Sequence, residues 1–248
     1  MTGGPPPQIE PTGVPPSPRA VPVRRALAWY EEAMRLWKRA PATWAALAFV
    51  TVAVELATDR LPGAASLVGK LVTPLVAAGM IVAALAADRN APVRITHAFA
   101  AFAAPAGAMA AIIVSSAVTL AGEAAAAWWI ADTNLLASDF DASSLTFVEI
   151  LGVYSAGVLV SLPFTFVPFH VLLEHAGVRA AFAASFRGFA LNTLPLVVYG
   201  AQSLLLLTIG IVSYGIGLMI ALPLIVAATY AAWKDVFGPR LDAPPPDA

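Results

Sequence analysis

Long apolar stretches, separated by short charged segments, occupy most of this chain. Residues 40–54, 95–122, 150–173 and 188–233 carry no formal charge, and Lys70 is the one charge within 61–87. The stretch 188–233 has 46 residues and would form a helix about 69 Å long, more than twice the roughly 30 Å of a bilayer's hydrocarbon core. We therefore predict two helices there, joined by a turn at Ser213–Gly215.

The pattern predicts an all-α polytopic membrane protein with six transmembrane helices. Backbone groups in lipid must be satisfied within their own segment, which favours helices, and the apolar runs lack the alternation of membrane barrel strands. The expected spans are residues 41–58, 64–87, 104–125, 146–173, 194–212 and 216–234.

Three short amphipathic segments each precede a pair of spans. Their apolar residues recur at helical spacing: Leu27, Tyr30, Met34 and Trp37, then Ile95, Phe99 and Phe102, then Val178, Phe182, Phe186 and Phe189. The second span of each pair also carries a proline, at Pro74, Pro163 and Pro223. This indicates an internal repeat of one interfacial helix and two spans. The alternative is that the segments are loops whose aromatic residues cap the bundle.

Amphipathic helices of this kind lie in the headgroup plane with arginines towards anionic lipid. The candidate lipid contacts are Arg35, Arg94, Arg179 and Arg187.

Composition excludes a soluble domain and several chemistries. Apolar residues make up 59% of the chain and charged residues only 12%, against roughly 25% in soluble domains. A net charge of -1 gives no indication of nucleic-acid binding, and the absence of cysteine excludes disulfides and thiolate sites. Twelve of the 14 basic residues fall on one side of the predicted spans, so both termini are expected in the cytoplasm.

Both ends of the chain are rich in proline. Residues 1–22 and 239–248 cannot bury enough apolar surface to offset the entropy of ordering, so we predict two disordered tails around a transmembrane domain at 23–238.

Few residues suggest chemistry. Glu55 and Lys70 are the most deeply placed charges and are a candidate intramembrane ion pair, functional or structural. Glu149 follows Thr146 at capping-box spacing. His170, Glu174 and His175 do not match zinc-protease spacing, so we expect a solvated helix end there. No nucleophile or phosphate-binding motif occurs, so we expect no catalytic residue, metal or cofactor.

Several short stretches carry a family resemblance when taken in order. They are Trp37–Trp44, Leu71–Gly79, Ala180–Phe186 with Asn192 and Val197–Gly200, and Leu222–Tyr230 with Lys234–Phe237. Together they resemble a family of uncharacterised proteobacterial inner-membrane proteins, similar in layout to the membrane domains of some glycerophosphodiester phosphodiesterases. The resemblance covers roughly residues 25–238. It implies a six-span fold in the inner membrane and no established activity or functional residue.

We therefore expect a non-catalytic integral inner-membrane protein that binds lipid or partner proteins in envelope assembly or maintenance. The alternative is a transporter or exporter of an apolar or amphiphilic compound, or of lipid. An enzyme acting on lipid headgroups ranks third, because its acid, base and metal ligands cannot be named. The expected partner is the bilayer, including anionic lipids; a protein partner or a homo-oligomer stays open.

Overall fold

A computed structural model describes residues 15–61, 64–137, 140 and 144–238. These residues form helices and no strand, which confirms the all-α class. The elements are α1 (Arg25–Trp37), α2 (Pro41–Asp59), α3 (Ala64–Asp88), the 3-10 helix η1 (Ile95–Ala103), α4 (Ala106–Ala131), α5 (Phe147–Ser161), the 3-10 turn η3 (Leu162–Phe164), α6 (Val167–Leu173), α7 (Val178–Leu191), α8 (Thr193–Val212) and α9 (Leu218–Phe237).

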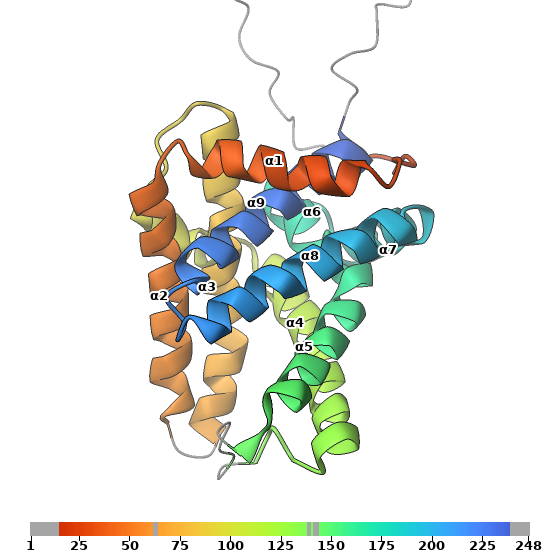
Figure 1. Ribbon diagram of the computed structural model, residues 1–248. Helices are drawn as coiled ribbons and strands as arrows, with labels where there is room; N and C mark the ends of the chain where they lie inside the picture. Colours follow the sequence, from red (N-terminus) through yellow and green to blue (C-terminus); the bar gives the residue numbers. More distant parts are fainter. Residues whose placement is uncertain (1–14, 62–63, 138–139, 141–143, 239–248) are drawn as a thin grey trace, which may run out of the picture.

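The helices form two upright pairs with an inclined pair between them (Figure 1). Helices α2 and α3 pack side by side, as do α4 and α5, while α8 and α9 cross the bundle obliquely. Helix α1 lies across one end, which we call the α1 end. The opposite end, reached by the loops after α2 and α4, is the distal end.

The described part of the chain contains five helices long and apolar enough to cross a membrane: α2, α4, α5 extended through η3, α8 and α9. Within α3, the apolar stretch Val72–Asp88 is too short to count among these membrane-spanning helices. The predicted spans match the observed helices to within three residues at most ends, but α4 continues to Ala131, six residues beyond the expected end. The turn predicted at Ser213–Gly215 is confirmed, because α8 ends at Val212 and α9 begins at Leu218.

Helix α9 is the centre of the molecule. It contacts α1, α2, α3 and α8, and two thirds of its apolar window is buried, against a third or less in each of the other four. Alanines recur along it, at positions 221, 227, 228, 231 and 232, and all are buried. Small side chains allow helices in lipid to approach closely, and close packing is a main source of their association.

Glycines permit two further close approaches. A Cβ at Gly79 of α3 would lie 2.2 Å from the backbone oxygen of His97, so only glycine allows η1 to lie against α3 here. A Cβ at Gly188 of α7 would lie 2.7 Å from the ring of Phe237 at the end of α9. Both interfacial segments are thus packed onto the bundle.

The single helix expected over 146–173 is wrong: α5 ends at Ser161, and α6 begins at Val167. Pro163 and Pro168 each lack the N–H that continues a helix and clash with the carbonyl four residues earlier. The side chain of Ser185, fully buried on α7, bridges the break. Its hydroxyl donates to the carbonyl of Pro163 at 2.8 Å and accepts from the N–H of Phe166 at 3.2 Å.

The folded region starts earlier than the residue 23 expected from composition. Residues 15–22 form no helix but are bonded to the bundle, since the amide of Arg19 donates to the carbonyl of Val236 at 2.9 Å. Asn192, between α7 and α8, accepts from the amide of Val21 and donates to the carbonyl of Arg19, at 2.8 and 3.0 Å. The tails predicted at 1–14 and 239–248 lie outside the described residues.

We predict that Ser185→Ala lowers the free energy of unfolding by about 1–3 kcal/mol, because it leaves the carbonyl of Pro163 and the amide of Phe166 without their shared hydroxyl. Reversible unfolding in mixed detergent micelles measures this change. Ser155→Ala is the matched control, since that hydroxyl bonds only within its own helix, to Leu151. Equal losses in the two variants would contradict the bridging role.

Candidate functional site

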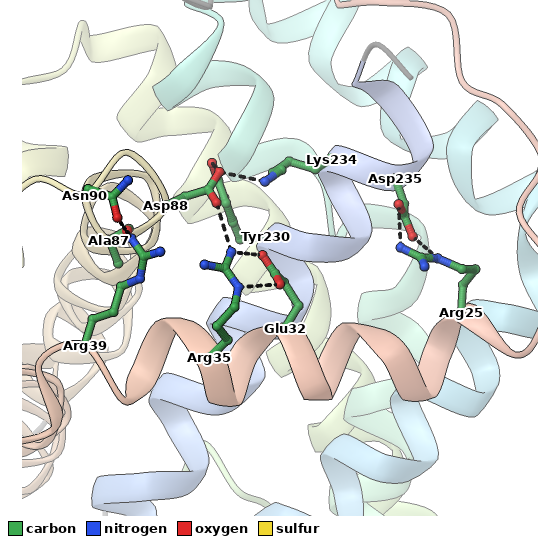
Figure 2. Close-up of polar contacts among 10 residues, drawn as sticks. All are labelled: Arg25, Glu32, Arg35, Arg39, Ala87, Asp88, Asn90, Tyr230, Lys234 and Asp235. Carbon is green, nitrogen blue, oxygen red and sulfur yellow. Dashed lines mark hydrogen bonds and ion pairs between the residues drawn. The ribbon is translucent and has the colours of Figure 1, made fainter. Parts of the chain in front are cut away.

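The carboxylate of Asp88 joins three helices at the α1 end (Figure 2). It accepts hydrogen bonds from Lys234 at 2.6 Å and from the hydroxyl of Tyr230 at 2.9 Å, both on α9. The guanidinium of Arg35 on α1 lies 3.4 Å from its other oxygen. Arg35 also pairs with Glu32, and this hydrogen bond raises the pKa of Arg35. Arg35, predicted as a lipid contact, therefore binds carboxylates of its own chain.

A second carboxylate fastens the other half of α1. Asp235 on α9 accepts two hydrogen bonds from Arg25, at 2.6 and 2.9 Å, and one from the indole N–H of Trp29, at 2.7 Å. At the opposite end of the helix, Arg39 donates to the carbonyl of Ala87 and to the side chain of Asn90 (Figure 2). Helix α1 is thus bound along its length to the ends of α3 and α9.

Of the predicted apolar face of α1, Tyr30, Met34 and Trp37 pack against the core, but the most deeply buried residues lie one position before them. Ala26, Trp29, Ala33 and Leu36 are fully buried, whereas Leu27, the first residue of the predicted face, is 60% exposed. The helix contacts α9, α8 and α3, so more than one of its faces is covered by protein.

The other three predicted lipid contacts are exposed. Arg94 precedes η1, and Arg179 and Arg187 lie on α7. In the described part of the chain no carboxylate lies within ion-pair distance of these three guanidinium groups. The neighbouring residues Ile95, Phe99, Phe102 and Phe186 are between 41% and 58% exposed. Apolar and cationic groups therefore lie side by side on these two surfaces.

Arg94 borders a surface groove of about 590 Å³ between η1 and the start of α2. The groove combines one cation and two hydroxyl-bearing residues with small apolar side chains: Ala42, Thr43, Ala46, Val93, Arg94, Ile95 and Thr96. Further along α2, towards the distal end, Phe49 and Leu56 are 63% and 57% exposed. They lie on the same helix face as Ala42 and Ala46. The groove, with its cation and two hydroxyl groups, thus continues into an apolar stripe.

At the distal end, Lys70 lies between two carboxylates. Its ammonium nitrogen is 3.7 Å from Glu55 and 3.0 Å from Asp59. Asp59 was not among the predicted site residues, although it follows Glu55 by one helical turn and so shares its face. Glu123 on α4 is close enough to interact electrostatically with Lys70 and Glu55. The cluster formed by Glu55, Asp59, Lys70 and Glu123, here the distal charge cluster, holds three carboxylates and one ammonium.

A cavity of about 280 Å³, open to the outside of the bundle, lies between α3, α4, the α5–α6 break and α9. Six hydroxyl-bearing residues line it, together with prolines and apolar side chains: Ser115, Ser116, Thr119, Ser161, Thr165 and Thr229. Because four separate elements contribute, no local spacing could have indicated the cavity.

Two predictions about charged side chains have opposite outcomes. The capping box at α5 is confirmed, because Thr146 accepts from the amide of Glu149, whose carboxylate accepts from the amide of Thr146. The solvated helix end expected at His170 and Glu174 is wrong. His170 is fully buried, its Nδ1 is 2.7 Å from Glu174, and its ring packs edge-on against Phe237. Phe237 lies on α9, 67 positions beyond His170, so local sequence could not indicate this burial.

Among the described residues, no group of three or more His, Asp or Glu side chains is arranged to hold a metal ion. Comparison of the chain with protein-family models, curated proteins and solved structures gave no match. The family resemblance inferred from short stretches therefore stays a prediction.

We predict that Asp88→Asn loosens α1, because the neutral amide loses the charge-assisted bonds to Lys234 and Arg35. The expected loss in the free energy of unfolding is about 1–3 kcal/mol. Trypsin should then cut α1 several-fold faster in the folded, detergent-solubilised protein. Glu31→Gln removes an exposed carboxylate from α1 and serves as control. Unchanged cleavage in the Asp88 variant would show that α1 is held by packing alone.

Proposed function

We propose that this chain is a non-catalytic integral protein of a bacterial inner membrane that binds anionic phospholipid at its α1 end. Its apolar helices are compatible with membrane insertion, and the excess of basic residues at the α1 end favours a cytoplasmic location for both termini. In this proposal α3 and the α5–α6 unit count among six spans. Helices α1, η1 and α7 each begin one unit of a threefold repeat.

The groove at Arg94 carries the lipid-binding proposal. A guanidinium forms charge-assisted hydrogen bonds to phosphate oxygens, and the hydroxyls of Thr43 and Thr96 add neutral donors. An acyl chain attached to that phosphate would follow the exposed stripe of α2 that includes Phe49 and Leu56. The groove therefore suits a phospholipid better than a free phosphate ion, which would use the cation but not the stripe.

The exposed arginines of α7 extend the same surface chemistry. Arg179 and Arg187 lie beside the exposed ring of Phe186, an arrangement suited to the boundary between headgroups and acyl chains. We propose that they contribute long-range attraction to the anionic leaflet, while Arg94 supplies the defined site. Binding at these positions would anchor the protein and recruit lipid around it, as expected of a component in envelope assembly or maintenance.

A second candidate function is transport of an amphiphilic molecule. The helix break at Ser161–Val167 and the cavity beside it favour this candidate. Interrupted helices at membrane depth are found in transporters, where they line substrate sites.

The absence of cysteine makes the orientation directly testable. We predict that a membrane-impermeant maleimide labels Leu136→Cys, in the loop after α4, in intact spheroplasts. Ser17→Cys should be labelled only after the membrane is permeabilised. Both positions are exposed, so accessibility of the thiol does not limit the reaction. Labelling of Ser17→Cys in intact spheroplasts would overturn the proposed orientation.

We predict that Arg94→Glu weakens binding of dioctanoyl phosphatidylglycerol by about tenfold or more, equivalent to roughly 1.4 kcal/mol. Native mass spectrometry of the micelle-solubilised protein counts the bound lipid. Arg89→Glu introduces the same charge change in the same connection but outside the groove, and should change affinity by less than about threefold.

Two further ligands test whether binding depends on the anionic headgroup and on the attached acyl chains. Dioctanoyl phosphatidylcholine should bind more weakly than phosphatidylglycerol, because its headgroup carries a compensating cation. Inorganic phosphate should not displace the bound lipid at equal concentration. Equal losses in the Arg94 and Arg89 variants would reduce the effect to general surface charge and would remove the groove as a site.

A further inference from the structure

The cavity and the distal charge cluster lie one helical turn apart along the same three helices. Pro74, Thr119 and Ser161 line the cavity on α3, α4 and α5. One helical turn towards the distal end, the corresponding positions are Lys70, Glu123 and Gly157. Residues four apart share a helix face, so these three positions continue the cavity walls outward.

The hydroxyl groups of the cavity are mostly committed as donors. Ser115, Thr119, Ser161, Thr165 and Thr229 each donate to a backbone carbonyl three or four residues earlier in their own segment, at 2.7–3.2 Å. A hydroxyl has one proton and two lone pairs, so what these groups offer to the cavity is lone pairs. In addition, Pro168 cannot donate to the carbonyl of Phe164, another lining residue. The polar groups of the cavity wall therefore offer mainly acceptors, although Thr229 also hydrogen-bonds the hydroxyl of Tyr199 and the rest of the wall is apolar.

The distal charge cluster, one turn beyond the cavity, carries more carboxyl groups than basic groups. Lys70 is already paired with Glu55 and Asp59, and no basic side chain of the described chain lies within ion-pair distance of Glu123. The carboxylate of Glu123 lies against Gly157, where a Cβ would be 2.2 Å from its Oε1. Glycine at this position thus leaves room for the carboxylate between α4 and α5.

We propose that the cavity binds the headgroup of a cationic amphiphile, a long-chain primary ammonium. The ammonium donates to the hydroxyl and carbonyl oxygens of the wall and to Glu123, while the alkyl chain leaves between the helices into the bilayer. About 280 Å³ is at the small end of ligand pockets, which suits a headgroup with its first methylene groups. This site uses the cavity that favours transport and does not depend on phospholipid binding at Arg94.

Charge selectivity follows from the acceptor-rich wall. A carboxylate or phosphate headgroup would face lone pairs and carboxylates and would find few donors, and an alcohol would bring one donor and no charge. Burial in a low-dielectric environment strengthens both the attraction and the repulsion. The cavity therefore discriminates between chains of equal length by the headgroup alone.

The test compares three matched twelve-carbon ligands at pH 7: dodecylamine, which is cationic, dodecanol and dodecanoate. Binding to the full-length protein in neutral maltoside micelles is measured by calorimetry at equal ligand mole fractions in the micelle. We expect dodecylamine to bind about tenfold or more tightly than either of the others. Ser116→Phe, which fills the cavity from α4, should abolish binding of dodecylamine.

Glu123→Gln should remove most of the preference for dodecylamine, whereas Glu149→Gln should preserve it. Glu149 lies near the distal start of α5, outside the cavity lining, so its substitution removes one carboxylate from the same end of the molecule. A second pair of variants tests the site with smaller changes that are less prone to cause misfolding. Thr119→Val should weaken binding of dodecylamine about threefold. Thr208→Val, which removes a hydroxyl that likewise bonds within its own helix, on α8, should not weaken it.

Equal affinity for the three ligands, or an unchanged preference in Glu123→Gln, would overturn the proposal. Loss of phospholipid binding in the Arg94 variant with retained dodecylamine binding would separate the two sites. Absence of any dodecylamine binding to the wild-type protein would remove the cavity proposal and leave the groove at Arg94 unaffected.

Discussion

The carboxylate of Asp88 determines how the α1 end of the bundle is assembled. It lies at the end of α3 and accepts from Lys234 and Tyr230 of α9 while facing Arg35 of α1. Apolar contact between helices gains little in lipid, since the acyl chains are equally apolar. Hydrogen bonds between helices and close packing of small residues must therefore supply much of the specificity. Asp88 provides the first of these, and the alanines of α9 provide the second.

The two ends of the molecule consequently differ in character. At the α1 end, most charged side chains of α1, α3 and α9 are paired across elements, and this network fastens α1 to the bundle (Figure 2). At the distal end, the charged groups around Lys70 include more carboxyl groups than basic groups and lie one helical turn from the cavity. The network at the α1 end explains stability, and the arrangement at the distal end is suited to ligand binding. The exposed arginines of η1 and α7 form a third, outward-facing surface.

Local pattern was sufficient for features determined by neighbouring residues. Most helix boundaries, the turn after Val212 and the capping box at Thr146 depend on spacing within a few residues and agree with the structure, the exceptions being the end of α4 and the break after Ser161. Reasoning from local pattern did not indicate contacts between residues far apart in the sequence. His170 looked like part of a solvated end, yet Phe237 covers it, and Arg35 looked free for lipid, yet Asp88 lies 53 positions further along the chain.

By itself the sequence determined that the chain is helical and apolar, because hydrophobicity and helix length are local properties that require no knowledge of neighbours. It also identified Pro163, which lies at the break after α5, but not that Pro74 and Pro223 would lie inside continuous helices. Only the tertiary structure decided which face of α1 is buried, that Ser185 bridges the break after Ser161, and that six hydroxyl-bearing residues share one cavity. These features depend on which helices pack together, and many pairings satisfy the same apolar pattern. Choosing among them requires the close-packing and hydrogen-bonding constraints of the whole bundle.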